Sequence, residues 1–269
     1  MYRVCVVTGA ASGIGLATTR HLRARGDHVI ACDLHDADVI ADLATPEGRA
    51  ELVAGVTRAS GGKVDAIIAN AGGGPPQTSV SLNFFGAVAT LEGLRPLLER
   101  SSAPRALAVS SVASMRPPLP GLVEACLKMD EPAALSITKT IANENQNPSS
   151  GVSADVNIGL DLYGSAKLAL QRWCRSVATK EQWAGAGIVL NVVALGFFDT
   201  PAAAYVLSDV RNREAMSRLF PLRGAFPGRP EEAAALLGWC VSAENTQMTG
   251  QILFADAGLE CSARGGASA

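Results

Sequence analysis

Two side chains able to move a proton lie four residues apart in the second half of the chain. Tyr163 and Lys167 have the spacing of residues that share one face of a helix. A nearby ammonium stabilises the charged form of a phenol, so the pair can exchange a proton with a substrate oxygen. A free phenol has a pKa of about 10. We therefore expect Lys167, together with an oxidised nicotinamide, to lower the pKa of Tyr163 toward neutrality.

A glycine-rich segment near the N-terminus has the pattern of a phosphate-binding turn. The sequence Thr8-Gly-Ala-Ala-Ser-Gly-Ile-Gly15 follows an apolar run at residues 4–7 and opens a helical pattern at residues 13–25. Glycines allow the backbone to approach a pyrophosphate, and the helix N-terminus supplies N–H groups and a positive dipole end. Cofactor contacts are therefore predicted at Gly9, Ser12, Gly13, Ile14 and Gly15.

An acidic residue after the second apolar run predicts which dinucleotide is bound. Asp33 follows residues 29–32, and its carboxylate can accept hydrogen bonds from a ribose diol and repel a 2′-phosphate. No lysine or arginine adjoins Asp33 or lies within the glycine segment. The sequence therefore favours NAD over NADP. A second cofactor contact is predicted at Asn70, Ala71 and Gly72, where the glycine permits close approach.

Strand and helix patterns alternate along most of the chain. Strands are predicted at residues 4–7, 29–32, 39–41, 66–69, 106–109, 188–193 and 251–255. Helices are predicted at residues 13–25, 46–59, 80–100, 161–182 and 231–241. This alternation predicts an α/β fold of the Rossmann type, a doubly wound parallel sheet of about seven strands. We expect residues 1–269 to form a single domain.

Two stretches depart from this alternation and are expected to surround the substrate. Residues 115–160 begin with prolines and contain two predicted short helices, at 122–129 and 133–142, followed by a polar, turn-rich segment at 143–151. This insert lies just before the helix that carries Tyr163, so it should emerge near the mouth of the site. Residues 196–228 form the expected substrate loop, whose aromatic side chains predict an apolar pocket. The substrate contacts expected there are Phe197, Phe198 and Tyr205.

Composition excludes several classes of protein. The 269 residues are 48% apolar and 18% charged, with a net charge of -2, which does not favour nucleic acid or an anionic membrane as a partner. Six scattered cysteines without a C-x-x-C pair predict a reducing, cytoplasmic location with no disulfide framework and no metal site. No apolar run is long enough to span a bilayer. The first strand begins almost at Met1, which leaves no room for a signal peptide.

Taken in order, these motifs resemble the short-chain dehydrogenase/reductase family. The matching positions are Thr8-Gly-x-x-x-Gly13-x-Gly15, Asn70-Ala-Gly72, Asn83, Ser110-Ser111 and Tyr163-x-x-x-Lys167. The resemblance covers essentially the whole chain apart from the insert. The chain departs from the family pattern at Leu195-Gly196, where a Pro-Gly pair is usual, at Ala69, where the family has asparagine, and at Ala257, where it has glycine. None of these changes removes a chemical group from the catalytic set.

The resemblance implies a role for each matching residue. Tyr163 would be the acid in ketone reduction and the base in alcohol oxidation, and Lys167 would also hold the nicotinamide ribose. Ser111 would bind the substrate oxygen, with Ser110 as the alternative if the register is shifted by one, and Asn83 would position a water in the proton relay. The family pattern also places Asp42 and Leu43 at the adenine, and Thr200 at the nicotinamide carboxamide. Gly196 lies in the loop over the nicotinamide.

The predicted activity is NAD-dependent interconversion of a hydrophobic secondary alcohol and its ketone. The substrate is either a hydroxysteroid or an aryl alkyl carbinol such as an aromatic amino alcohol, and the cellular direction is open. A homodimer or homotetramer is expected. The alternative from another class is a non-catalytic NAD-binding sensor, which would not need the catalytic set. An epimerase or dehydratase built on the same pair is a further rival, usually with a longer chain. A serine hydrolase fits poorly, since all three histidines lie early and no G-x-S-x-G is present.

Overall fold

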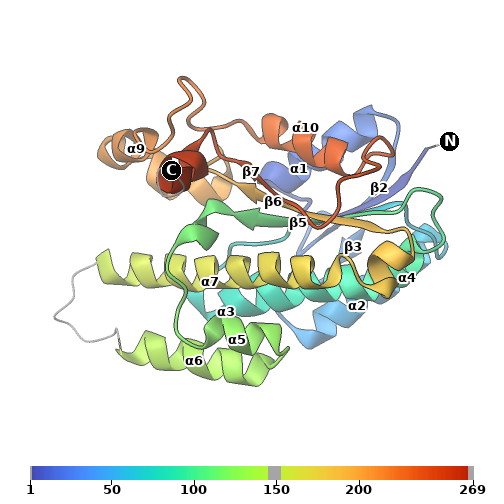
Figure 1. Ribbon diagram of the computed structural model, residues 1–269, viewed down its shortest axis with the longest axis horizontal. Helices are drawn as coiled ribbons and strands as arrows, with labels where there is room; N and C mark the ends of the chain where they lie inside the picture. Colours follow the sequence, from blue (N-terminus) through green and yellow to red (C-terminus); the bar gives the residue numbers. More distant parts are fainter. Residues whose placement is uncertain (1, 145–152, 266–269) are drawn as a thin grey trace.

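The computed structural model describes residues 2–144 and 153–265, and they form one parallel sheet flanked by helices (Figure 1). The sheet has seven strands in the order β3-β2-β1-β4-β5-β6-β7. They are β1 (Val4–Thr8), β2 (His28–Asp33), β3 (Val39–Ile40), β4 (Ala66–Ala69), β5 (Arg105–Ser111), β6 (Val189–Leu195) and β7 (Ile252–Ala255). The predicted Rossmann-type sheet of about seven parallel strands is therefore confirmed.

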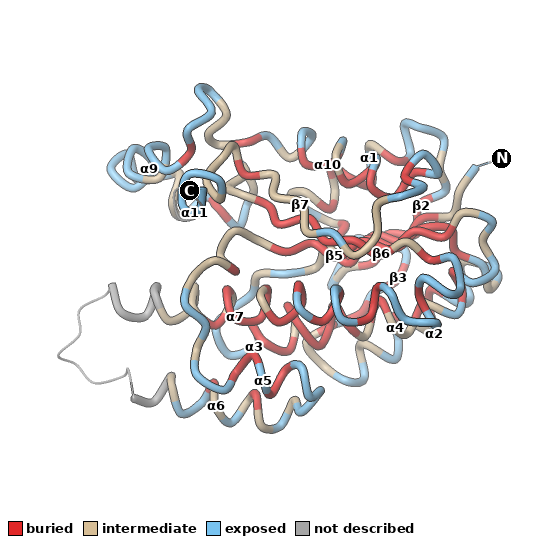
Figure 2. The backbone as a smooth tube through the Cα atoms, viewed as in Figure 1, coloured by how far each residue is buried: buried red, intermediate tan, exposed pale blue. Residues whose placement is uncertain are grey.

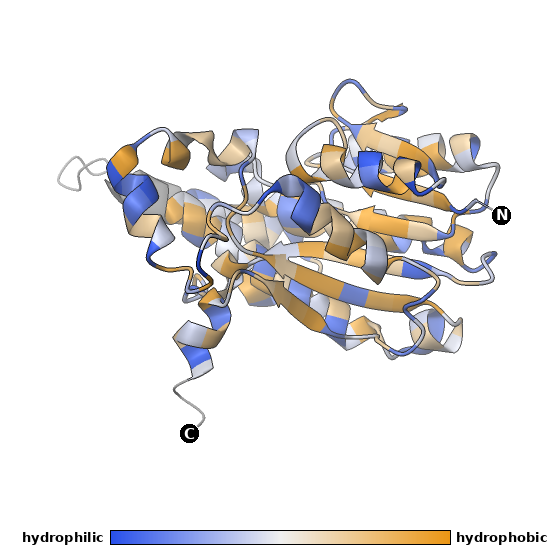
Figure 3. Cartoon of the chain, turned by 90° about the horizontal axis from the view of Figure 1, so that it is seen from above, coloured by the Kyte–Doolittle hydropathy of each residue, from blue (hydrophilic) through white to orange (hydrophobic). Residues whose placement is uncertain are grey.

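The central strands are apolar because helices cover both of their faces. All four residues of β4 are buried, as are four of the five residues of β1. The buried backbone runs through the middle layer (Figure 2), and the strands are mostly hydrophobic when seen from above (Figure 3). A parallel sheet covered on both sides has this composition. Since β1 lies between β2 and β4, the connections leave it in opposite directions, which opens a crevice at the carboxyl ends of these strands.

Each face of the sheet has its own hydrophobic core. On one face, α1 (Gly13–Ala24) and α10 (Pro230–Cys240) pack together. On the other face lie α2 (Pro46–Ser60), α4 (Ala87–Leu98) and α7 (Ser153–Val177) (Figure 1). Leu22 and Leu237 belong to the first core, whereas Leu91 and Leu170 belong to the second. Five of the cysteines are buried and unpaired, and Cys261 is exposed.

Two helices differ from their predicted bounds, and both differences concern the site. The helix predicted at residues 80–100 is three pieces, α3 (Pro76–Val80), a π-helical turn (Ser81–Gly86) and α4. The helix predicted at 161–182 begins earlier, at Ser153, and ends at Val177. The N-terminal extension was missed because Gly159 and polar neighbours weaken the local helix signal. Packing of α7 against α3 and α5 (Leu122–Leu127) supplies the stabilisation that the local sequence lacks.

The insert contributes the helices α5 and α6 (Glu131–Glu144), which lie beside α7 (Figure 1). The predicted polar segment at 143–151 therefore starts too early, since α6 continues through Glu144, and its remainder at 145–151 lies outside the described residues. The remaining short helices are Val112–Met115, Glu181–Gly185, Pro201–Ala203, α8 (Ala204–Leu207), α9 (Val210–Ser217) and α11 (Leu259–Arg264). The single-domain assignment, with an insert at 115–160 and a substrate loop at 196–228, stays a prediction.

Within the described ranges, none of the helices has both the length and the apolar character needed to cross a bilayer.

Candidate active site

A cavity of about 1360 Å³ opens at the carboxyl ends of the central strands. Its lining includes every residue predicted to contact the cofactor, namely Gly9, Ser12, Gly13, Ile14, Gly15, Asp33, Asp42, Leu43, Asn70, Ala71, Gly72, Tyr163, Lys167, Gly196 and Thr200. The predicted Ser111, Phe197 and Phe198 line the same cavity. These residues come from segments far apart in the sequence, and parallel strands bring them together because their carboxyl ends share one edge of the sheet.

The first helix begins at the cavity without a side-chain cap. Ser12 is the N-cap of α1 but makes no capping hydrogen bond, and the first bond of the helix joins the Leu16 N–H to the Ser12 carbonyl. By contrast, Thr45 caps α2, where its hydroxyl accepts a hydrogen bond from the Gly48 N–H at 3.0 Å. The N–H groups and positive dipole end of α1 therefore face the cavity in a form suited to a phosphate.

Close backbone packing explains the glycines of this turn. A Cβ on Gly15 would collide with the Gly9 carbonyl and lie 2.7 Å from Asn70 Nδ2. The Asn70 amide donates to the Thr8 carbonyl at 3.0 Å, while the Thr8 hydroxyl accepts from the Asn70 and Ala71 N–H groups, each at 3.0 Å. These bonds tie the end of β4 to the end of β1. The turn is therefore held rigidly, as a pyrophosphate-binding loop requires.

Asp33 braces the same turn from the end of β2. One carboxylate oxygen accepts the Ala11 N–H at 2.8 Å, and the other accepts the Leu34 N–H at 2.6 Å. The side chain is half-buried and lines the cavity. Across the cavity, a Cβ on Gly13 would lie 3.2 Å from Thr200 Cγ2, so the loop after β6 closes over the glycine turn. These residues fit an extended dinucleotide, with an acid near one ribose and backbone N–H groups near the phosphates.

Helix α7 presents Tyr163 and Lys167 to the cavity from one face. Lys167 Nζ lies 5.6 Å from the centre of the Tyr163 ring and donates a hydrogen bond to the Val109 carbonyl at 2.8 Å. Only 2% of Lys167 is exposed, and this burial lowers the pKa of its ammonium to about 7. Burial also raises the pKa of Tyr163 above its ordinary value, and a hydrogen bond with Ser111 offsets only part of that rise.

One part of the sequence-based expectation is therefore wrong for the chain by itself. Lys167 does not lower the pKa of Tyr163 below its ordinary value, because burial disfavours the charged form of both groups. A phenolate at this position needs a further positive charge in the cavity.

The two neighbouring serines have different partners. The Ser111 side chain is hydrogen-bonded to Tyr163 and accepts the Ala113 N–H at 3.2 Å. The buried Ser110 hydroxyl instead donates to the Lys167 carbonyl at 3.2 Å and accepts from Gln171 Nε2 at 2.9 Å. Strand alternation separates the two side chains in this way. The structure thus pairs Ser111, rather than the alternative Ser110, with the tyrosine.

Gln171 is a residue that the sequence analysis missed. Its amide nitrogen donates to both Ser110 and Ser114, the latter at 2.8 Å, and the Ser114 hydroxyl donates to the Ser111 carbonyl at 2.7 Å. Gln171 therefore fixes the strand end that carries Ser111. Its position four residues beyond Lys167, on the same helix face, was a signal that could have identified it.

Asn83 is the predicted catalytic residue that does not line the cavity. It lies fully buried in the π-helical turn, where its side chain accepts the Gly73 N–H at 3.0 Å and donates to the Gly73 carbonyl at 2.9 Å. A Cβ on Gly72 would lie 2.7 Å from Asn83 Oδ1 and 3.1 Å from Lys167 Nζ. Asn83 thus holds the backbone that borders Lys167, and its role in positioning a water stays a prediction.

The substrate side of the cavity combines the loop after β6 with the insert. Phe197 stacks on Phe226, with ring centres 5.3 Å apart, and Phe226 stacks on Phe220. The side chain of the predicted Tyr205 lies outside the described part of the structure. The insert contributes Met115, Arg116, Gly159 and Leu160, as expected for a segment at the mouth. Lining residues that were not predicted are Val206, Asn212, Ala215, Met216, Leu259 and Ala263.

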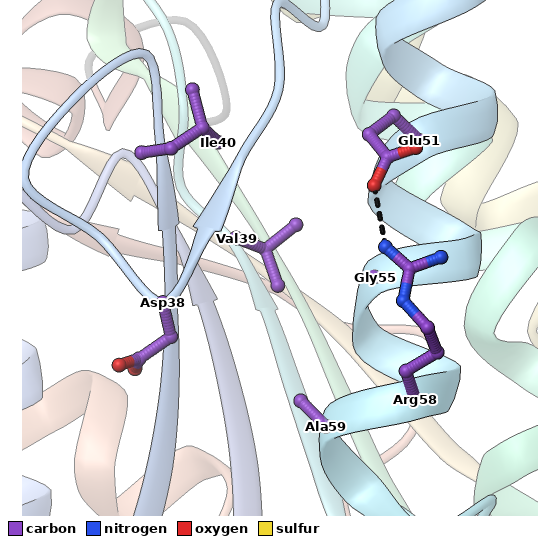
Figure 4. Close-up of a pocket in the computed structure, with 7 residues that line it drawn as sticks. All are labelled: Asp38, Val39, Ile40, Glu51, Gly55, Arg58 and Ala59. Carbon is purple, nitrogen blue, oxygen red and sulfur yellow. Dashed lines mark hydrogen bonds and ion pairs between the residues drawn. The ribbon is translucent and has the colours of Figure 1, made fainter.

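A second, smaller hollow of about 490 Å³ lies between the edge strand β3 and helix α2 (Figure 4). Its charged groups are Asp38, Glu51 and Arg58, of which the last two form an ion pair at 2.7 Å. Arg58 and Glu51 are largely exposed. No lining side chain of this hollow resembles a proton-transfer pair, so the large cavity is the candidate active site.

The fold and this site agree with the comparisons to known proteins. Residues 9–260 match the short-chain dehydrogenase model described as enoyl-(acyl carrier protein) reductase. The chain belongs to the short-chain dehydrogenase/reductase family.

Individual relatives span nearly the full chain. It is 33% identical to the 3-alpha-hydroxysteroid dehydrogenase/carbonyl reductase of Comamonas testosteroni, over 96% of both chains. It is 29% identical to the cis-4-hydroxycyclohexanecarboxylate dehydrogenase of Sinomonas cyclohexanicum, over 95% of this chain and 96% of that one. Among solved structures, the 3-alpha-hydroxysteroid dehydrogenase of Pseudomonas sp. B-0831 complexed with NADH matches with a TM-score of 0.83 and 32% identity, covering 97% and 98% of the two chains.

Proposed function

We propose that this protein is an NAD-dependent oxidoreductase that interconverts a hydrophobic secondary alcohol and its ketone, with Tyr163 as the proton donor and acceptor. The observation that carries the proposal is the placement of Ser111, Tyr163 and Lys167 in the same cavity as the uncapped N-terminus of α1. A dinucleotide held at that N-terminus and at Asp33 would reach across the cavity to the tyrosine. Relatives named as dehydrogenases of cyclic secondary alcohols support this reaction class.

The proton chemistry follows from the contacts of three side chains. Bound NAD supplies the hydride acceptor and, in its oxidised form, a positive charge. Tyr163 takes the alcohol proton during oxidation and returns it to the ketone oxygen during reduction. Ser111, which shares a hydrogen bond with Tyr163, holds the same substrate oxygen and stabilises charge that develops on it. Lys167 places its nitrogen beneath the tyrosine ring, where its charged form favours the phenolate.

The preference for NAD over NADP rests on Asp33. Its carboxylate lines the cavity one residue before an exposed turn, and both of its oxygens already accept backbone N–H groups. A 2′-phosphate placed beside this fixed negative charge would be repelled, whereas a ribose diol can donate to it. The solved relative from Pseudomonas sp. B-0831 is a complex with NADH.

The substrate is proposed to be a hydroxysteroid or an aryl alkyl carbinol, including aromatic amino alcohols. Phe197, Val206 and Met216 give this side of the cavity an apolar lining. An apolar pocket with a few polar groups suits a rigid, hydrophobic alcohol. The homodimer or homotetramer expected from the resemblance stays a prediction.

A screen of secondary alcohols with NAD, followed at the nicotinamide absorbance, tests this function. The wild type should oxidise at least one hydroxysteroid or aryl carbinol. Tyr163→Phe should reduce turnover by about 10²–10⁴-fold, the usual contribution of a positioned acid–base group, while NADH affinity is retained. Tyr2→Phe is the matched control, because Tyr2 is 69% exposed and lies outside the cavity. Tight NADH binding with no turnover by the wild type on any alcohol or ketone would favour the sensor instead.

A further inference from the structure

The guanidinium of Arg49 joins three segments that are distant in the sequence. Arg49 lies in the first turns of α2, and only 12% of its side chain is exposed. Its Nε donates to the Leu43 carbonyl at 2.9 Å, and one terminal nitrogen donates to the Ser81 carbonyl at 3.0 Å. Both terminal nitrogens also bind the carboxylate of Glu131, at 2.6 and 2.8 Å. This forked contact fixes the plane of the guanidinium as well as its position.

Two of the three segments bound by Arg49 belong to the cofactor cavity or support it. Leu43 lines the cavity. Ser81 opens the π-helical turn that contains Asn83, which in turn holds both backbone groups of Gly73. A π-helical turn departs from regular helix geometry and needs external support for its carbonyl groups. Arg49 therefore braces the cavity wall and the turn behind it with one side chain.

The third segment is the insert. Glu131 is the first residue of α6, and 21% of its side chain is exposed. Burial alone would raise the pKa of Glu131, but hydrogen bonds from Arg49 and Ser81 outweigh burial and hold that pKa below its ordinary value. The carboxylate therefore stays charged near neutrality. Removing its charge would leave a largely buried guanidinium without its anionic partner, which is a destabilising situation.

Packing around Leu43 leaves little room for the cavity wall to move independently. A Cβ on Gly86 would lie 2.7 Å from the Leu43 carbonyl oxygen and 3.0 Å from its Cβ. Gly86 ends the same π-helical turn whose first carbonyl binds Arg49. The Arg49 guanidinium carbon lies 5.8 Å from the centre of the Phe85 ring, within the range of a cation–π contact. A shift of the guanidinium would therefore displace Leu43.

We propose that Glu131 and Arg49 are positioning residues for the dinucleotide, so that the insert helps to set cofactor affinity as well as to border the substrate. Glu131 orients the guanidinium, and the guanidinium fixes the Asp42–Leu43 wall, which the family pattern puts at the adenine. This inference rests on the proposed function, because it assumes that the cavity holds a dinucleotide.

Glu131→Gln in the full-length protein tests the proposal, since it keeps the shape of the side chain and removes its charge. We expect the Kd for NADH to rise about fivefold, a change typical of coupling through a packed network. The Kd for AMP, which carries only the adenine half, should rise in parallel. By contrast, kcat at saturating concentrations should stay within about twofold, because the Ser111–Tyr163–Lys167 contacts are untouched. General loosening of the fold would lower kcat as well.

Glu51→Gln is the matched control. Glu51 lies on the same helix as Arg49 and forms an ion pair of similar length with Arg58, but both side chains are more than half exposed. Exposed pairs contribute little, so Glu51→Gln should leave both Kd values unchanged. If Glu131→Gln does not fold, as judged by its thermal melt, Arg49→Lys replaces it. That variant keeps the positive charge but loses the fork, and its Kd for NADH should also rise.

The outcomes separate this inference from the proposed function. A wild type that binds no NADH would overturn the proposed function. A wild type that binds NADH, with an unchanged Kd in Glu131→Gln, or in Arg49→Lys where Glu131→Gln does not fold, would overturn the role of the insert and leave the proposed function standing. A rise in Kd equal to that of Glu51→Gln would also overturn it.

Discussion

The two ends of the cavity are built from different kinds of structure. The end near the glycine turn consists of backbone and short polar side chains, and the hydrogen bonds of Thr8, Asp33 and Asn70 attach it directly to the sheet. The end near the insert consists of side chains on short helices and turns, and α9 buries none of its residues. Cofactor geometry is thus fixed by the core of the fold, whereas substrate geometry depends on peripheral segments that can change without disturbing the sheet.

This difference predicts different consequences for substitutions. Changes at the glycine end should weaken cofactor binding and destabilise the protein. Changes at the insert end should alter the choice of substrate while cofactor affinity and the fold remain intact.

The largest effect is expected at Lys167, where the two ends meet. Lys167→Met removes the nitrogen that lies beneath the Tyr163 ring, so turnover should fall by about 100-fold or more, as for the loss of one electrostatic stabiliser. Steady-state kinetics with the best alcohol from the screen would measure this. Turnover within about threefold of the wild type would show that the lysine is not part of the catalytic set.

The same variant should change the pH dependence of stability. Burial lowers the pKa of Lys167 from 10.5 to about 7, so between these pH values the unfolded chain binds one more proton than the folded chain. Stability therefore rises with pH across this window and is lost as pH falls toward 7. Lys167→Met should lack this contribution. Urea unfolding of both proteins at pH 7 and pH 9 would test it, and parallel changes in the two proteins would contradict it.

The next largest effect is expected at the glycine end. Gly15→Ala forces a methyl group into the Gly9 carbonyl and the Asn70 amide, which should destabilise the fold by about 1–3 kcal/mol and raise the Kd for NADH by more than about tenfold. The thermal melt and an NADH titration would measure both effects.

Gly159→Ala is the matched control for this glycine. Gly159 lines the other end of the cavity, and a Cβ there would lie 3.5 Å from Pro76, an ordinary contact. It should leave NADH affinity unchanged and stabilise α7 by up to about 1 kcal/mol. Equal losses of NADH affinity in the two variants would remove the distinction between the ends.

A change in cofactor choice is expected at Asp33. Asp33→Asn keeps one acceptor for the Ala11 N–H or the Leu34 N–H but removes the charge that would repel a 2′-phosphate. The ratio of kcat/KM with NAD to kcat/KM with NADP should fall by about tenfold, equivalent to about 1.4 kcal/mol. An unchanged ratio would mean that Asp33 only braces the turn.

Most of the cofactor end could be predicted from the sequence, because its requirements are local. The glycine spacing and an acid after the next strand are each readable within a few residues, and parallel topology then brings them together. The partners of Ser111 and Ser110 were left open because one residue of register decides them. Contacts such as Arg49 with Glu131 join positions with no shared local pattern, so no periodicity indicates them.

The start of α7 and the π-helical turn escaped prediction for a related reason. Ser153–Leu160 reads as polar and glycine-containing, and tertiary packing against α3 and α5 determines its helical form. The π-helical turn depends on support from Arg49 and on the bonds of Asn83 to Gly73. Helix propensity does not encode either contact.

The smallest effect is expected at the substrate end. Phe197→Ala removes one stacked ring from Phe226 and enlarges the apolar lining. Stability should fall by about 1 kcal/mol, in the range of an aromatic pair. KM for bulky alcohols should change by about three- to tenfold, as expected for a hydrophobic pocket, while the Kd for NADH stays constant. A loss of NADH affinity would show that this loop belongs functionally to the cofactor end.

The central claim is that Tyr163 becomes a base only when the bound cofactor adds positive charge beside it. Ultraviolet difference titration of tyrosinate, with Tyr163→Phe as the reference, measures the pKa of this phenol directly. Without cofactor, the pKa should lie above the ordinary value of 10.0, as burial dictates. With saturating NAD it should fall below that value. A pKa that is unchanged or raised in the complex would contradict the account.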